Sequence, residues 1–178
     1  MATRYRTEIE HVEYLDGKAH ARISGRHDHA LIVGQIGFTI DRCAGDRGTS
    51  SFSTDAYLKK RGPRRTKLIP DVSFISEEQY RAHPRSAWDE PPFSPEIAAE
   101  VVSPGESEAY LQAKFDRYLA TGSILVLEVS PEKRTIIAHA ATGVRLFTES
   151  ELFEHPAVPW LRFELRTIFR VLERFKRG

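Results

Sequence analysis

The sequence predicts a mixed α/β (α+β) fold, in which one central mixed β-sheet is flanked by helices and preceded by an N-terminal hairpin. Three observations predict it. Short apolar runs rich in β-branched residues have the length of strands. Other segments repeat their apolar residues at the spacing of a helix. The order is strands, helix, strands, helix, strands, helix, and a single sheet covered by helices satisfies it most simply.

The N-terminal half supplies the hairpin, the first helix and two long strands. Residues 8–15 and 18–23 are strand-like on either side of an Asp16-Gly17 turn, which is typical of a hairpin. Leucine and isoleucine recur at helical spacing after Asp28. The expected elements are a helix over 28–42, strands over 50–58 and 67–76, and a polar turn over 60–64 between the two strands.

The C-terminal half begins with an apolar run that we interpret as a core strand. Ser103, Pro104 and Glu106 then form a helix-start pattern, with a cap, a proline at the first helical position and a capping box. Gly122 is typical of the residue just past a helix end. The expected elements are a strand over 96–102, a helix over 103–120, strands over 124–129, 134–140 and 144–148, and a terminal helix from about residue 165.

Length and composition indicate one soluble domain over residues 1–178. The net charge of +1, from 26 basic and 25 acidic side chains, excludes a globally basic nucleic-acid binder but not a local basic patch. Cys43 is the single cysteine and cannot form an internal disulfide, so we expect a reducing compartment, the cytoplasm. No segment approaches the roughly 18 apolar residues of a membrane span, so no membrane partner is expected.

Two carboxylates lie on predicted strands. Because alternate strand residues share a face, Glu100 points away from its apolar neighbours Ala99 and Val101. Asp71 precedes another apolar strand, 28 intervening residues earlier. A buried carboxylate needs a cation, a metal or water, and few oxygen ligands with room for water suit Mg²⁺. Taken singly, Glu100 also fits a solvent-facing edge position, and Asp71 fits a turn.

Lys114 is the third residue of this predicted site. It lies on the helix that follows Glu100, beside the apolar stripe and on the face that holds Tyr118. An ammonium group there can reach back over the sheet, orient an attacking water or offset charge that develops on phosphorus. Taken alone, Lys114 is better explained as a solvated helix lysine; the ordered set of two carboxylates and a lysine favours the site.

The pattern Pro70-Asp71, then Glu100-Val101, then Lys114 resembles the PD-(D/E)xK nuclease superfamily and, within it, a bacterial family described as restriction endonucleases. The resemblance covers roughly residues 15–147. It implies a restriction-endonuclease-like core acting on DNA. It also implies that Asp71, Glu100 and the backbone carbonyl of Val101 hold Mg²⁺, for which Mn²⁺ substitutes.

The sequence departs from that superfamily at two positions. The usual lysine, two residues after the glutamate, is replaced by Val102, and Lys114 takes its role, with Gln112 nearby as an alternative. A glutamate of the first helix that joins the metal site in relatives corresponds to Gln35. The resemblance therefore assigns auxiliary places to Gln35, Gln112 and Tyr118.

A basic cluster and a histidine pair complete the candidates. Six basic residues in nine positions precede the strand of Asp71, and we expect them to contact nucleic-acid phosphates; a solvated turn is the alternative. His29 is favoured as a helix-start residue near the active cleft, because too few further ligands are present for zinc. The basic residues are Lys59, Lys60, Arg61, Arg64, Arg65 and Lys67.

The sequence thus predicts a Mg²⁺-dependent endodeoxyribonuclease. We expect a homodimer, because double-strand cutting is simplest with one active site per strand. Two alternatives remain open: a catalytically inactive nuclease-like module that binds nucleic acid or a protein, and an enzyme acting on another phosphoester.

Overall fold

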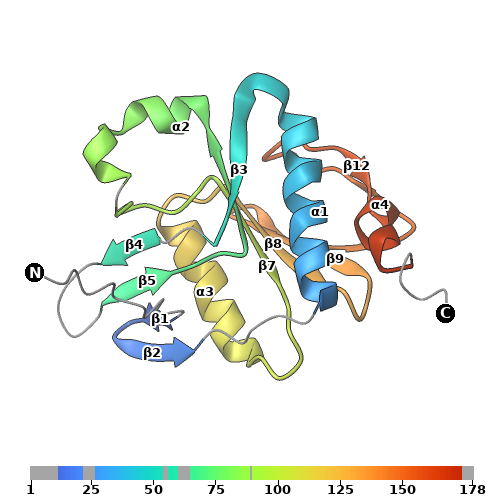
Figure 1. Ribbon diagram of the computed structural model, residues 1–178, viewed down its shortest axis with the longest axis horizontal. Helices are drawn as coiled ribbons and strands as arrows, with labels where there is room; N and C mark the ends of the chain where they lie inside the picture. The colour runs from blue at the N-terminus through green and yellow to red at the C-terminus, as the bar shows by residue number, and fades with distance from the viewer. Residues whose placement is uncertain (1–11, 22–26, 54–55, 60–64, 89, 174–178) are drawn as a thin grey trace, which may run out of the picture.

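A six-stranded mixed sheet forms the centre of the computed structural model (Figure 1). The structure describes residues 12–21, 27–53, 56–59, 65–88 and 90–173. The strand order is β10-β9-β8-β7-β6-β3, in which β7 and β8 are parallel and the other pairs antiparallel. The strands are β3 (Gly48–Phe52), β6 (Val72–Ser76), β7 (Ile97–Val101), β8 (Leu125–Ser130), β9 (Thr135–Ala140) and β10 (Gly143–Thr148).

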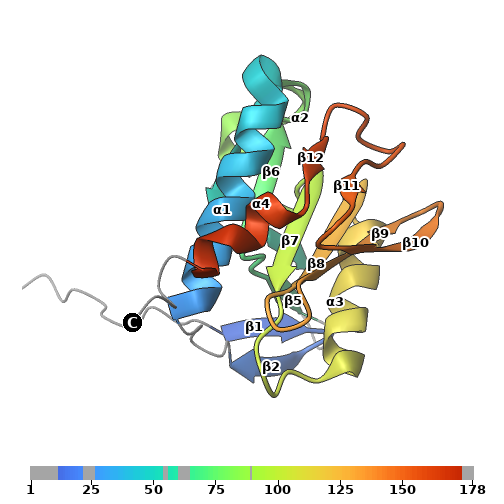
Figure 2. The ribbon, with the colours of Figure 1, turned by 90° about the vertical axis from the view of Figure 1, so that its right-hand side faces the viewer.

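Helices cover both faces of this sheet (Figure 2). Helix α1 (His27–Ala44) packs on one face, where an apolar cluster including Ile36, Phe74 and Leu127 forms the larger core. Helix α3 (Glu108–Ala120) packs on the other face, beside a smaller cluster that includes Phe115 and Val126. The predicted central mixed sheet, its flanking helices and the N-terminal hairpin are confirmed.

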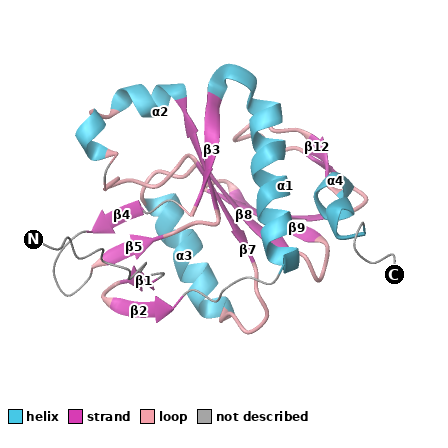
Figure 3. Cartoon of the chain, in the orientation of Figure 1, coloured by secondary structure: helices cyan, strands magenta, loops and turns pink. Residues whose placement is uncertain are grey.

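A second, four-stranded sheet was not expected. Its order is β2-β1-β5-β4, and it lies beside α3 (Figure 3). The two long strands predicted over 50–58 and 67–76 are each broken, because Ser53 has a positive φ of 50° and Pro70 lacks the N–H that a ladder needs. The strands are β1 (Val12–Leu15), β2 (Lys18–Ala21), β4 (Ala56–Lys59) and β5 (Thr66–Leu68).

The helix predicted over 103–120 begins later than expected. Glu106 does accept a hydrogen bond from the N–H of Ser103, at 2.7 Å, as a capping box requires. Gly105, however, has a φ of 92°, which no helical residue adopts. Ser107 therefore becomes the cap, and α3 runs over Glu108–Ala120. The predicted end, just before Gly122, is confirmed.

The C-terminal segment packs against α1. A two-stranded sheet precedes a short helix whose buried residues include Ile168 and Phe169. None of the helices in the described part of the chain has the length and apolarity that a membrane crossing requires. The remaining elements are α2 (Glu77–Ala82), β11 (Leu152–Phe153), β12 (Phe163–Glu164), α4 (Arg166–Phe169) and the 3₁₀ turns 45–47, 85–87 and 170–173.

Candidate active site

Asp71 and Glu100 lie on the same face of the β6–β7 pair. Val72 pairs with Ala99, and both belong to the core under α1. The residues one step outward from that pair, Asp71 and Glu100, therefore share the opposite face. A hydrogen bond fixes the arrangement, because the N–H of Val101 donates to Asp71 Oδ2 at 2.8 Å.

Glu100 is buried, and its two oxygens differ. Its Oε1 accepts a hydrogen bond from the hydroxyl of Tyr118 at 2.7 Å and pairs with Lys114 Nζ at 2.8 Å. Its Oε2 has no hydrogen-bond partner among the described residues. Burial raises the pKa of Glu100 to about 8, against the attraction of Lys114, and the charges of Asp71 and Glu13 raise it further. A cation beside Oε2 therefore favours the ionised form.

Lys114 projects from α3 into the interior. The parallel strands β7 and β8 are joined by α3, as in a βαβ unit, so one face of α3 must lie over Glu100. Lys114 occupies the buried stripe of α3 together with Leu111 and Tyr118, and only 2% of its side chain is exposed. Burial alone would lower the pKa of Lys114, but the adjacent Glu100 and Glu13 raise it above its ordinary value.

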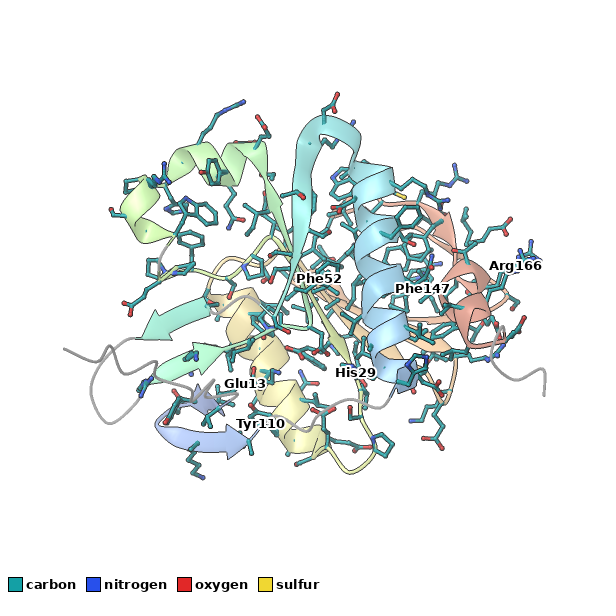
Figure 4. The ribbon with its side chains drawn as sticks, viewed as in Figure 1. Glu13, His29, Phe52, Tyr110, Phe147 and Arg166 are labelled. Atoms are coloured by element: carbon teal, nitrogen blue, oxygen red, sulfur yellow. The ribbon has the colours of Figure 1, made fainter. Side chains whose placement is uncertain are left out.

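The sequence prediction missed Glu13. Its Oε2 lies 3.0 Å from Lys114 Nζ and accepts a hydrogen bond from the hydroxyl of Tyr110 at 2.8 Å, while its Oε1 accepts one from the N–H of Ile69 at 2.7 Å. Figure 4 labels Glu13 and its partner Tyr110. Lys114 thus lies between two buried carboxylates. The available signal was alternation, because Glu13 shares its strand face with the buried Leu15.

His29 joins the site from the first turn of α1. Its Nε2 lies 3.2 Å from Asp71 Oδ2, which agrees with the predicted place of His29 near the cleft. Among the described residues, no group of three or more His, Cys, Asp or Glu side chains is arranged to hold a metal ion. The pair Asp71 and Glu100 leaves most ligand positions to backbone, water or substrate oxygens. That donor set suits Mg²⁺ and does not suit zinc.

A family model covers most of the chain. Residues 2–165 match the model of the Uma2 family, described as "Putative restriction endonuclease". The chain belongs to the Uma2 family. A search of curated proteins returned no match.

A solved structure has a similar fold. It is described as a putative nuclease belonging to DUF820 from Anabaena variabilis ATCC 29413. It superposes with a TM-score of 0.74 at 15% sequence identity, and the alignment covers 90% of each chain. This likeness supports the nuclease-like fold assigned above.

The structure does not bring the two glutamines of the predicted site to the carboxylates. Gln35 donates to Thr39 Oγ1 at 3.4 Å, along its own helix, and makes no hydrogen bond to Asp71 or Glu100 within the described ranges. Gln112 is exposed and donates to Asp116 at 2.8 Å. Of the two candidates for the role of the missing lysine, Lys114 is buried against Glu100 and Gln112 is exposed.

The basic cluster falls largely outside what the structure describes. Lys60, Arg61 and Arg64 lie outside the described residues, and nothing is described of the side chain of Lys59. Arg65 is half-buried, with its guanidinium 4.1 Å from the ring centroid of Tyr14. Lys67 is buried, so a phosphate contact from Lys67 would need a change of conformation. That the basic cluster contacts nucleic-acid phosphates stays a prediction.

Proposed function

We propose that this chain is a Mg²⁺-dependent endonuclease that hydrolyses phosphodiester bonds of DNA, with Mn²⁺ as a substitute ion. The observation that carries the proposal is the contact of Lys114 Nζ with Glu100 Oε1 at 2.8 Å, on the sheet face that also holds Asp71. Two strand carboxylates and a buried lysine from a different element form one site. Membership of a restriction-endonuclease family supports DNA as the substrate.

Asp71, Glu100 and the backbone carbonyl of Val101 would hold the ion. When bound, such an ion polarises the phosphodiester and lowers the pKa of a coordinated water. Tyr118 and Lys114 both engage Oε1 of Glu100, which orients the carboxylate and leaves Oε2 for the ion. His29 and the N–H of Val101 both contact Oδ2 of Asp71, which orients that carboxylate.

Lys114 has two tasks in this proposal. Its ammonium orients the attacking water, or offsets the negative charge that develops on the phosphoryl oxygens. When Glu100 binds the ion, Glu13 stays paired with the ammonium of Lys114 and keeps that group protonated and in position. A homodimer in the cytoplasm, with one site for each strand, would complete a double-strand cut.

The test is cleavage of supercoiled plasmid and circular single-stranded DNA with Mg²⁺, Mn²⁺ or EDTA. Asp71→Asn and Glu100→Gln keep side-chain shape while removing ligand charge. We expect each to lower the cleavage rate about a hundredfold or more, because a catalytic ion contributes several kcal/mol to transition-state stabilisation. EDTA should abolish cleavage by the wild type.

Glu128→Gln is the matched control. Glu128 lies opposite Glu100 on β8, on the same face, but pairs with His139 at 3.1 Å. Its substitution should leave the rate within about twofold, because its carboxylate contacts His139 and not Asp71, Glu100 or Lys114. Equal rates for wild type, Asp71→Asn and Glu100→Gln would refute the site. Salt-dependent DNA binding without cleavage by the wild type would favour an inactive binding module instead.

A further inference from the structure

A cleft opens beside the candidate metal site. Its volume is about 630 Å³, within the range of roughly 300–1,000 Å³ that small-molecule sites occupy. We call it the aromatic cleft. Its floor is formed by strands β3 and β6, and one wall by α2 and the loop that follows. The residues that define it are Ser51, Ser73, Ile75, Tyr80, Trp88 and Phe93.

The floor of the aromatic cleft continues into the candidate active site. Ser73 follows Asp71 by two residues and lies on the same face of the sheet, since the intervening Val72 points into the core under α1. Two residues of extended chain span about 7 Å. The N–H of Ser53 also donates to the carbonyl of Asp71, at 3.3 Å, which holds the neighbouring chain at this corner. A ligand can therefore reach both places at once.

The wall presents aromatic rings to this space. The rings of Tyr80 and Trp88 lie 5.0 Å apart, and Trp88 meets Phe93 edge-on at 5.2 Å. Tyr80 is 57% exposed although it is a large aromatic residue. Trp88 and Phe93 are half-buried behind it. Aromatic rings along a groove are the platforms on which single-stranded nucleic acids stack their bases.

The polar atoms of the same region distinguish a base from a purely apolar ligand. Trp88 Nε1 and Gln79 Oε1 are buried without a hydrogen-bond partner among the described residues. Buried donors and acceptors are normally satisfied, so Trp88 of the wall, with its unpaired Nε1–H, gains by rearranging around a ligand that has a hydrogen-bonding edge. Asp46 and Glu77 also line the cleft and repel phosphate, which favours a base inside the cleft and the phosphate outside it.

We infer that the aromatic cleft binds an unpaired nucleobase of the DNA strand whose phosphate lies at Asp71 and Glu100. Bases of an intact duplex are paired and stacked, so a base can enter only from a single-stranded, mismatched or flipped position. The substrate class is therefore DNA with unpaired bases. This inference rests on the proposed function, because it places the scissile phosphate at the carboxylates.

Binding in EDTA tests the inference without catalysis. The probes are a short labelled oligothymidylate and an abasic strand of equal length. Tyr80→Ala should raise the Kd for oligothymidylate at least about fivefold and leave the abasic strand unchanged, because stacking contributes about 1–3 kcal/mol per base. Phe38→Ala, an equally exposed aromatic on α1, is the control and should change neither Kd.

A second measurement reports contact directly. The chain has two tryptophans, so in a Trp160→Phe background the fluorescence comes from Trp88. Oligothymidylate should quench it and the abasic strand should not. The inference is overturned if Tyr80→Ala binds both strands as the wild type does, or if Trp88 fluorescence responds equally to both.

The two proposals fail separately. If Asp71→Asn stops cleavage while Tyr80→Ala leaves the affinity for oligothymidylate unchanged, the endonuclease stands and the aromatic cleft is not a base site. If the wild type never cleaves but Tyr80→Ala weakens binding of the thymine strand, the base site stands and the catalytic proposal fails.

Discussion

On the face that packs against α1, strands β6 and β7 present Val72, Phe74 and Ala99 to a fully apolar core. On the face toward α3, the same two strands carry Glu100 and, directly before β6, Asp71. The two faces are almost equally buried: Val101 is 2% exposed and Glu100 is 4% exposed. Burial therefore does not distinguish the two faces. They differ in the groups that each face contacts.

The difference is in what stabilises each face. The α1 face is stabilised by removal of apolar area from water, which is roughly additive and tolerates substitutions of similar size. The α3 face holds Glu13, Lys114 and Glu100, whose charges are tolerable only together. One substitution on the α1 face should cost a little stability, whereas one on the α3 face should disturb the whole set.

Lys114→Met should have the largest effect. It leaves two buried carboxylates without their cation, and breaking a buried ion pair by removing one partner costs about 3–5 kcal/mol. We expect the free energy of unfolding, measured by urea denaturation, to fall by that amount. Lys133→Met makes the same change at an exposed turn and should shift it by less than about 0.5 kcal/mol.

A triple variant separates charge from packing. Adding Glu13→Gln and Glu100→Gln to Lys114→Met removes the unpaired charges and should recover part of the lost stability. If Lys114→Met unfolds at the same urea concentration as the wild type, the α3 face is not stabilised as a set, and the contrast between the two faces is wrong.

Glu13→Gln should have an intermediate effect. The amide oxygen can keep the hydrogen bond from the N–H of Ile69, but the NH₂ group in place of Oε2 no longer accepts from Tyr110 or Lys114, and the negative charge next to Lys114 is removed. Lys114 then acts on Glu100 alone and competes more strongly with a metal ion. We expect Mn²⁺ affinity, measured by titration calorimetry, to fall about tenfold, equivalent to about 1.4 kcal/mol. The fold should melt within a few degrees of the wild type.

Glu128→Gln also serves as the charge control for that measurement. It removes one carboxylate from the same face but from the pair with His139 rather than from the Lys114 set. An equal loss of Mn²⁺ affinity in Glu13→Gln and Glu128→Gln would mean that only the overall field matters, and that Glu13 has no specific place in the site.

Much of the fold follows from local patterns. The alternation around Glu100 predicted the correct face for each residue of β7, because a strand between two packed layers has only two sides. The sequence did not predict the breaks of the two long strands at Ser53 and Pro70. They depend on a positive φ at a serine and on a second sheet whose pairing joins distant segments.

The site residues divide in the same way, into those that a local pattern predicts and those that tertiary contacts bring in. The motif indicated Asp71, Glu100 and Lys114 because their order is fixed by strand, strand and helix. Glu13 lies 101 positions before Lys114 and reaches it only through pairing of β1 with β5 and the packing of α3. A sequence shows that a strand carries an acid on its apolar face, but the partner of that acid is decided by tertiary contacts.

Ile36→Val should have the smallest effect and sharpens the comparison from the other side. Ile36 is buried on α1 against the apolar face, and the loss of one methylene there costs about 1 kcal/mol. Urea denaturation should show that decrease, while Mn²⁺ affinity and cleavage rate stay unchanged, because α1 contacts the carboxylates through His29 in its first turn and not through Ile36. A change in Mn²⁺ affinity would show that packing under α1 sets the position of Asp71, and the two faces would then have to be treated as one coupled unit.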